Sequence, residues 1–281
     1  MELSNKLLQP YLATARITGI GGPSGKPQVG TGFFLDFACD AGKTSRWLVT
    51  NKHLVEGCTE VVLRLHAGEQ TNDGKFNMTR EWFELVSKAP AGMTVNHPTD
   101  DLCAMSGEDI VKGAGCIGKL LAAESLTEGM IPAQATLEEM SVSEDVIIVG
   151  YPAGRMDEKH GLPVLRRGCT ASHPGLSFGG GCRGLLDAHI YFGSSGSPVL
   201  VWDDRLYLDA GQARERSRRV LLGVVVDHDS DEVEGEVLVN GARTTPSAVA
   251  RVKVPLHLGS YIRAEALLVL KEAIRAGGRL V

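Results

Sequence analysis

Glycine and other turn-forming residues cut this chain into short apolar runs, and this pattern constrains the fold more than any other feature. The chain has 34 glycines in 281 residues. Gly, Pro, Asn and Asp bound the runs, which are rich in β-branched and aromatic residues. The clearest runs cover residues 30–37, 46–50, 60–65, 145–152, 197–202 and 220–226. Short strands with frequent turn signals are typical of all-β sandwiches and barrels rather than of alternating strands and helices.

Helical periodicity is confined mainly to the two ends of the chain. Residues 1–9 are compatible with a short helix, and residues 261–277 combine apolar positions at helical spacing, good helix formers and a Gly-Gly stop. The stretch 106–140 shows no strong strand pattern. We therefore expect the boundary between two domains there.

Composition excludes several classes of partner. The net charge is −5, and the basic residues are scattered except for Arg214, Arg216, Arg218 and Arg219, so a nucleic-acid partner is not expected. No apolar run approaches the roughly 20 residues of a membrane helix, so no membrane partner is expected either. Polar residues and a proline interrupt the N-terminal segment before a signal-peptide core can form. The sequence thus predicts a cytoplasmic protein.

Cysteine spacing argues against metal sites and a disulfide framework. The six cysteines are widely spaced without a CxxC pair, which favours free thiols in a reducing compartment. They are Cys39, Cys58, Cys103, Cys116, Cys169 and Cys182.

Three segments resemble ligand-binding motifs but lack a required residue. Residues 42–44 lack the glycine that a phosphate-binding loop needs, because Phe37 stands in its place. Residues 227–231 resemble the start of a calcium loop, but Glu232 occupies the glycine position, so we expect a solvated acidic loop. Cys169, His173 and Cys182 lack a second ligand pair for zinc. No metal and no cofactor are therefore predicted.

Three other segments carry chemically useful side chains. His53 ends a β-prone run, Asp100 and Asp101 lead into another, and Ser195 lies in a tight glycine-rich turn before a third. Each segment alone is typical of an ordinary turn or strand end. Together they supply a hydroxyl, an imidazole that can accept its proton, and a carboxylate that can hold the imidazole in the right tautomer. The glycines of the GSSG turn let its backbone amides bend toward a developing oxyanion.

The ordered set of motifs resembles the trypsin-like serine peptidases, in particular the bacterial members. The chain order His, Asp, Ser is that of the chymotrypsin-type arrangement and differs from the orders in α/β-hydrolases and subtilisins. The resemblance covers about residues 30 to 265. Its motifs are GTGFF (30–34), VTNKHLV (49–55), DLCAM (101–105), VGYP (149–152), RGCTAS (167–172) and FGSSGSPV (192–199).

The resemblance implies a chymotrypsin-like fold and a reaction. Two packed antiparallel β-barrels are expected, residues 10–115 with His53 and Asp101, and residues 140–262 with Ser195, followed by a C-terminal helix over 262–281. Carried over by position, His53 is the general base, Asp101 orients it, Ser195 attacks, and the amides of Gly193 and Ser195 form the oxyanion hole. Asp100 is the competing carboxylate. Asp101 is preferred because it directly precedes the apolar strand.

The resemblance also implies, in less detail, which residues line the substrate site and which side chains the site prefers. By resemblance, His189 lies at the floor of the primary specificity pocket, Gly259 lines another wall, and Val226 lies in the strand beside the substrate. No Asp occupies the floor position, so a preference for Arg or Lys is not predicted. Small or medium apolar side chains are favoured, and an acidic one requires a charged His189.

Departures from the family pattern bear on regulation. Ser194 stands where zymogen-type relatives have Asp, and Ser197 where most have Gly. An intracellular endopeptidase of broad activity would damage its host, so we expect a protein or peptide substrate of restricted choice or control by a regulatory protein partner. Two alternatives to a serine endopeptidase remain: a non-catalytic peptide-binding pseudo-protease, and an esterase-type acyl hydrolase with the same nucleophile.

Overall fold

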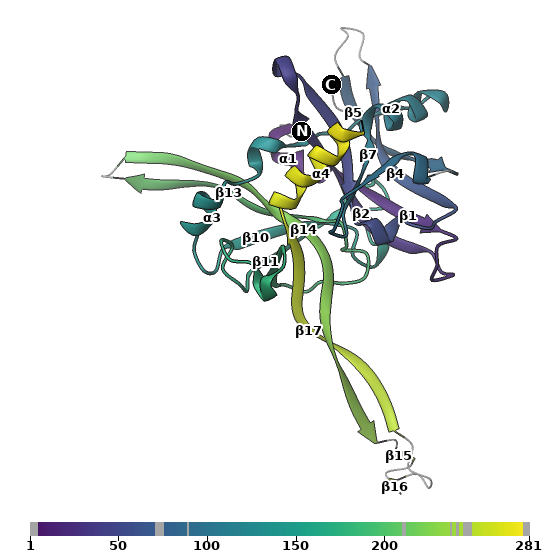
Figure 1. Ribbon diagram of the computed structural model, residues 1–281, viewed down its shortest axis with the longest axis vertical. Coiled ribbons are helices and arrows are strands. Elements are labelled where there is room, and N and C mark those ends of the chain that lie inside the picture. Colours follow the sequence, from purple (N-terminus) through teal and green to yellow (C-terminus); the bar gives the residue numbers. More distant parts are fainter. Residues whose placement is uncertain are drawn as a thin grey trace.

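Two antiparallel β units form the body of the molecule, and two long β-hairpin arms project from it (Figure 1). This arrangement comes from a computed structural model. It describes residues 5–70, 76–88, 90–209, 212–236, 238–239, 242–243 and 249–277.

The first unit is a nine-stranded sheet with the order β5-β4-β1-β2-β3-β7-β6, to which β8 and β9 add by pairing with β4 and β2. Seven strands follow the chain: β1 (Thr14–Ile20), β2 (Gln28–Ala38), β3 (Thr44–Thr50), β4 (Glu60–Gln70), β5 (Phe76–Ser87), β6 (Thr94–Asn96) and β7 (Cys103–Ser106). The two short strands are β8 (Leu120–Leu121) and β9 (Leu126–Thr127).

The second unit is a closed barrel with the order β10-β11-β12-β17-β14-β13. Its strands are β10 (Asp145–Gly150), β11 (Val164–Thr170), β12 (Arg183–Asp187), β13 (Pro198–Asp209), β14 (Gln212–Glu236) and β17 (Val249–Arg263). A short separate hairpin pairs β15 (Leu238–Val239) with β16 (Ala242–Arg243).

The arms extend three barrel strands well beyond the runs recognised in the sequence. β13 and β14 stay paired out to Asp209 and Gln212, and β14 and β17 out to Glu236 and Val249. The expected acidic loop over 227–231 was therefore wrong, because this segment belongs to β14 and pairs with β17. Polar residues conceal such strands from sequence patterns, since their pairing uses backbone hydrogen bonds rather than a buried face.

In the described residues four α-helices accompany the strands. They are α1 (Asn5–Leu12), α2 (Gly107–Cys116), α3 (Gln134–Glu138) and α4 (Glu265–Ala276). Neither α2 nor α3 was predicted from the sequence. Ser106 caps α2 by accepting a hydrogen bond from the Asp109 N–H at 3.3 Å. A serine followed by acidic residues is a known but weak sequence signal for the start of a helix. Among the described residues, no helix is long and apolar enough to cross a membrane.

The C-terminal helix begins later than the sequence pattern suggested. Tyr261 and Ile262 lie within the residues that the sequence predicts to be helical. In the structure they belong to β17 and pair with Val225 and Val224 in the barrel. Barrel closure thus overrides local helix propensity at these positions. The described part of the helix begins at Glu265 and ends at Ala276.

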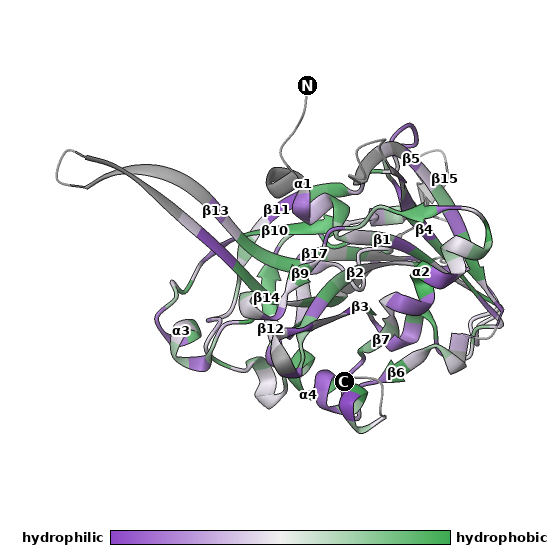
Figure 2. Cartoon of the chain, turned by 90° about the horizontal axis from the view of Figure 1, so that it is seen from above, coloured by the Kyte–Doolittle hydropathy of each residue, from purple (hydrophilic) through white to green (hydrophobic). Residues whose placement is uncertain are grey.

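Three hydrophobic clusters build the cores. One lies within the first unit and one within the barrel, while the third combines Phe33 and Trp47 of the first unit with Leu200 and Val224 of the barrel and Leu267 of α4. In Figure 2 the strands of the two units carry most of the hydrophobic colour. The third cluster fixes the two units against each other, so residues from both can form one site.

Burial on both faces explains the unbroken apolar runs. Phe34 and Leu48 belong to the core of the first unit, whereas their chain neighbours Phe33 and Val49 belong to the cluster between the units. Successive side chains of a strand point to opposite faces, so a strand covered on both sides needs no polar alternation.

The predicted all-β class is confirmed: the described residues form mainly antiparallel strands, including a closed barrel, with the helix α4 near the C-terminal end. The first of the two expected barrels is here the nine-stranded sheet. The division into residues 10–115, 140–262 and 262–281 stays a prediction. β8 and β9 lie between the first two of these spans and pair with β4 and β2 of the first unit.

Candidate functional site

His53 lies directly after β3, in a short 3-10 turn at Lys52–Leu54. Its Nδ1 is 2.6 Å from Asp101 Oδ2, and its backbone N–H donates to Asp101 Oδ1 at 3.0 Å. One carboxylate therefore holds both the ring and the main chain of His53. With Nδ1 occupied as a donor to Asp101, the other ring nitrogen, Nε2, is left as the basic atom.

The Asp101 carboxylate is kept ionised by these contacts. Burial by itself raises the pKa of Asp101, but the hydrogen bonds and charge of His53, together with the Lys52 charge, outweigh it. The net pKa is lowered from its ordinary value. In addition, the Asn51 side chain donates to the Asp101 carbonyl at 2.7 Å, which ties the carboxylate turn to the end of β3.

Asp100, the competing carboxylate, faces a different histidine. Its Oδ2 is 3.5 Å from His97 Nδ1, and its backbone N–H donates to the same nitrogen at 2.8 Å. The structure thus brings Asp101 to His53 and turns Asp100 toward His97.

Ser195 lies in the turn that precedes β13 of the barrel. Its Oγ donates to the Val226 carbonyl at 3.0 Å, and within the described part of the chain no hydrogen bond joins it to His53. The first unit nevertheless approaches this turn closely, because a Cβ at Gly196 would overlap the Thr31 carbonyl of β2. Gly196 has a φ of 83°, a left-handed conformation that favours glycine.

Two backbone donors beside Ser195 have no protein acceptor. Among the described residues, the N–H groups of Gly193 and Ser195 make no hydrogen bond, whereas the N–H groups of Ser194 and Gly196 donate to Tyr191 and Val225. Buried backbone N–H groups are seldom left unpaired. A pair of free donors flanking a serine can bind an oxyanion.

The turn is ordered by neutral local hydrogen bonds. Ser194 is buried, its N–H donates to the Tyr191 carbonyl at 2.9 Å, and its Oγ accepts from the Tyr191 N–H at 3.4 Å. The Ser197 N–H donates to the Ser194 carbonyl at 3.0 Å. Local bonds of this kind can order a turn that has no Asp at position 194.

Thr31 joins the site, although the sequence motifs assigned it no role. It is fully buried in β2, its N–H donates to the Ser195 carbonyl at 2.8 Å, and its Oγ1 donates to the Gly193 carbonyl at 3.1 Å. The available signal was a threonine between two glycines in a buried strand, whose hydroxyl must find partners inside the protein.

The predicted substrate-facing residues lie around the same turn. The exposed His189 ring lies 3.7 Å, centroid to centroid, from the His257 ring. Val226 provides the carbonyl that Ser195 uses. A Cβ at Gly259 would overlap the side chain of Ile190, which is buried. The Ile190 side chain thus occupies the space next to the Gly259 Cα, where a side chain of residue 259 would lie.

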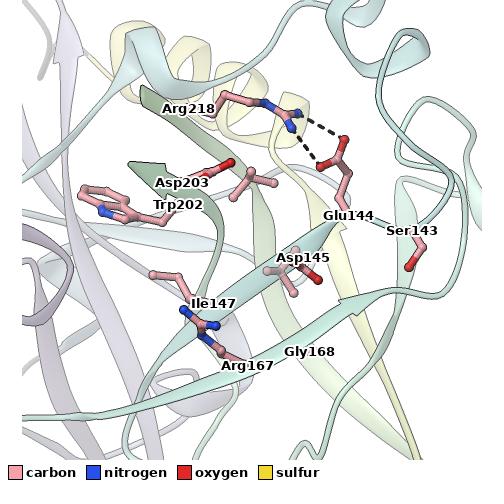
Figure 3. A pocket seen from close by; sticks show the side chains of 11 residues that line it. Ser143, Glu144, Asp145, Ile147, Arg167, Gly168, Trp202, Asp203 and Arg218 are labelled. Atoms are coloured by element: carbon pink, nitrogen blue, oxygen red, sulfur yellow. Dashed lines mark hydrogen bonds and ion pairs between the residues drawn. The ribbon is translucent and has the colours of Figure 1, made fainter. Parts of the chain in front are cut away.

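A separate pocket lies elsewhere on the described part of the barrel. It measures about 540 Å³, and none of the predicted site residues lines it. Glu144 and Arg218 form a two-pronged ion pair at its wall, with distances of 3.0 and 3.2 Å (Figure 3). These two charges therefore largely neutralise each other at the wall of the pocket.

No group of three or more potential metal-binding side chains occurs in the part of the chain that the structure describes. The side chains at 227–231, considered above for a calcium loop, lie outside the described ones.

Comparisons with known proteins give a limited result. No protein-family model matches the chain, and no curated protein matches it. Among solved structures, it is similar to the active form of the Rv3671c protease from M. tuberculosis, with 16% sequence identity and a TM-score of 0.45. The match covers 96% of this chain and 82% of that one. At this identity and score, function is inferred from the geometry of the site alone.

Proposed function

We propose that this protein is a serine endopeptidase that cleaves peptide bonds through an acyl-enzyme. The observation that carries the proposal is that the Asp101 carboxylate makes two hydrogen bonds with His53, one to Nδ1 at 2.6 Å and one to the backbone N–H at 3.0 Å. It sets the imidazole up as a base in a site where a glycine-rich turn offers a serine hydroxyl and two unpaired N–H groups.

The proposed reaction begins when the Ser195 hydroxyl exchanges the Val226 carbonyl for the imidazole. His53 Nε2 takes the hydroxyl proton as Oγ bonds to the substrate carbonyl carbon, and the carbonyl oxygen becomes an oxyanion. The N–H groups of Gly193 and Ser195 bind this oxyanion. The imidazolium then gives its proton to the leaving amine, and the C–N bond breaks. Water, deprotonated by His53, releases the acid product from Ser195 by the same steps.

A fluorophosphonate probe tests the proposal directly. We expect it to label Ser195 in the folded protein and not in Ser195→Ala. Labelling should survive iodoacetamide treatment, because none of the six cysteines lies in the glycine-rich turn. In addition, burial raises the pKa of the Cys103 and Cys182 thiols, which lowers their reactivity. A peptide library compared with simple esters completes the test. No labelling at Ser195 would indicate a peptide-binding pseudo-protease, and turnover of esters alone would indicate an acyl hydrolase.

Ile190 supports a preference for small side chains before the scissile bond. We propose that His189, Val226 and Gly259 line the substrate site and that the Ile190 side chain, packed against Gly259, makes it shallow. Ile190→Ala should raise kcat/KM for a leucine substrate relative to an alanine substrate by about 10-fold or more, since each methylene of pocket space is worth roughly 10- to 200-fold. The measurement is a series of peptides that differ at this one position. An unchanged order of preference would show that the pocket lies elsewhere.

The neutral Ser194 predicts activity without N-terminal processing. In zymogen-type relatives, an Asp at this position pairs with a newly made N-terminal amine, and Ser194 cannot form that ion pair. Residues near Arg16 belong to β1, which is paired on both sides with β2 and β4, so a cut there would break a central strand. We expect an uncleavable tag ahead of Met1 to change kcat/KM by less than about threefold, well under the effect of losing a buried ion pair. A tagged form that becomes active only after cleavage would contradict this expectation.

A cytoplasmic location, a restricted choice of protein substrate and a regulatory protein partner remain parts of this proposal. Cleavage products from lysate treated with the wild-type protein or with Ser195→Ala, compared by mass spectrometry, would identify the substrates.

A further inference from the structure

We propose that Thr31 is a positioning residue whose hydroxyl, reaching across from the first unit, aligns the two N–H groups that bind the oxyanion. This inference rests on the proposed function, because it assigns a task within the same site. Thr31 does not touch the substrate. It acts through Gly193 and Ser195.

Four hydrogen bonds satisfy Thr31, and two of them come from its hydroxyl. Oγ1 donates to the Gly193 carbonyl and accepts from the Tyr151 N–H, both at 3.1 Å. The Thr31 N–H donates to the Ser195 carbonyl at 2.8 Å, and the Thr31 carbonyl accepts from Thr50 Oγ1 at 2.7 Å. Thr31 is fully buried, so water does not compete for these bonds.

These bonds act on the direction of the free N–H groups because each peptide unit is planar. In a trans peptide, the carbonyl and the following N–H point in opposite directions. The Phe192 carbonyl accepts from the Ala153 N–H at 2.5 Å, which sets the peptide plane that carries the Gly193 N–H. The Thr31 hydroxyl holds the next plane, which contains the Gly193 carbonyl and the Ser194 N–H and lies between the planes of the two free N–H groups. Hydrogen bonds therefore restrain both the peptide unit before the Gly193 Cα and the peptide unit after it.

Gly193 needs such restraint more than other residues would. Its φ is 90°, and a Cβ there would lie 2.5 Å from the Tyr151 carbonyl, so only glycine fits. Glycine also rotates more freely than any other residue. Without the Thr31 hydroxyl, the peptide plane between Gly193 and Ser194 would lose the hydrogen bond that joins it to the first unit.

Thr31 also couples the turn to the histidine. Thr50, which donates to the Thr31 carbonyl, ends β3 three residues before His53. Thr31 therefore contacts both β3, the strand that leads to His53, and the turn that contains Ser195. In this chain the turn has no Asp at position 194 to order it through an ion pair, so neutral hydrogen bonds order it, both the local ones within the turn and those to Thr31.

The test uses two pairs of variants that differ only by a hydroxyl. Wild type is compared with Thr31→Val, and Thr31→Ser with Thr31→Ala. The matched control is Thr170→Val. Thr170 is a buried strand threonine whose Oγ1 likewise donates to one carbonyl, that of Val142 at 3.1 Å, and accepts one N–H, that of Glu144 at 2.9 Å.

The primary readout is the rate constant for labelling of Ser195 by the fluorophosphonate, which needs no knowledge of the substrate. In each pair we expect the variant without the hydroxyl to react about 10- to 100-fold more slowly, which is less than the roughly 10²- to 10³-fold loss of a whole oxyanion donor. With the best library peptide, the loss should fall on kcat and leave KM nearly unchanged, because the interaction is made in the transition state. Thr170→Val should label at the wild-type rate.

Three outcomes would overturn the inference. These are equal rates within both pairs, an equal loss in Thr170→Val at a similar fall in Tm, or a loss confined to KM. If Thr31→Val does not fold, the pair Thr31→Ser and Thr31→Ala decides by the same criteria. Labelling of the wild type with equal rates in the variants refutes only the role of Thr31. Absence of labelling in the wild type refutes the proposed function as well.

Discussion

If the proposed mechanism holds, Ser195→Ala and His53→Ala are each expected to lower kcat by about 10⁴-fold or more, as in measured triad knockouts of serine hydrolases. The alanine at 195 leaves no nucleophile on the turn, and the alanine at 53 leaves no base for its proton. The two losses should not add in the double variant, because the hydroxyl and the imidazole act as one unit. The measurement is kcat on the best library peptide, with near-UV circular dichroism to establish folding.

The control for this prediction is residual activity. The free N–H groups at Gly193 and Ser195 remain in both variants, so some rate above the uncatalysed reaction should persist. Wild-type activity in Ser195→Ala, or acyl transfer from substrate to a cysteine, would contradict a serine mechanism.

The second large effect separates the two neighbouring carboxylates. Asp101→Asn should lower kcat by about 10³- to 10⁴-fold, because the amide favours the wrong imidazole tautomer and no longer stabilises the imidazolium. Asp100→Asn should change kcat by less than about fivefold, since Asp100 contacts His97 and its loss touches neither His53 nor Ser195. The two variants remove the same charge from adjacent positions, so each is the control for the other.

The pair also tests the assignment itself. If Asp100→Asn is inactive while Asp101→Asn keeps its activity, then Asp100, and not Asp101, is the carboxylate that assists His53. Equal losses in both variants would point to the turn between β6 and β7 as a structural unit rather than to a specific partner of His53.

Several strands and the candidate residues could be read from the sequence because their signals are local. The runs at 30–37, 46–50 and 145–152 consist of β-branched and aromatic residues between turn formers, and they became β2, β3 and β10. The predicted choice of Asp101 over Asp100 rested on its place directly before an apolar strand. In the structure Asp101 lies 2.6 Å from His53, and its catalytic role stays a prediction.

Other features gave a weak local signal or none. In both arms the β14 segments, 212–219 and 227–236, are rich in charged and polar residues and pair through the backbone, so no hydrophobic period marks them. The apolar alternation over 252–258 in β17 was a signal that the sequence analysis did not use. α2 is short, and its cap at Ser106 is a weak pattern beside many serines in turns. Tyr261 and Ile262 look helical in sequence, and the closing pairs of the barrel decided otherwise.

What the sequence alone determined is the class of fold and the types and order of the reactive residues, since strand propensity, turn chemistry and the motifs around His53, Asp101 and Ser195 are written in neighbouring positions. Only the tertiary structure decided which groups meet. The bonds from Thr31 to the turn at Gly193 and Ser195, and the packing of Ile190 on Gly259, join segments far apart in the chain. Their physical basis is the buried core between the two units and the rule that buried polar groups need partners, and both depend on the whole folded chain.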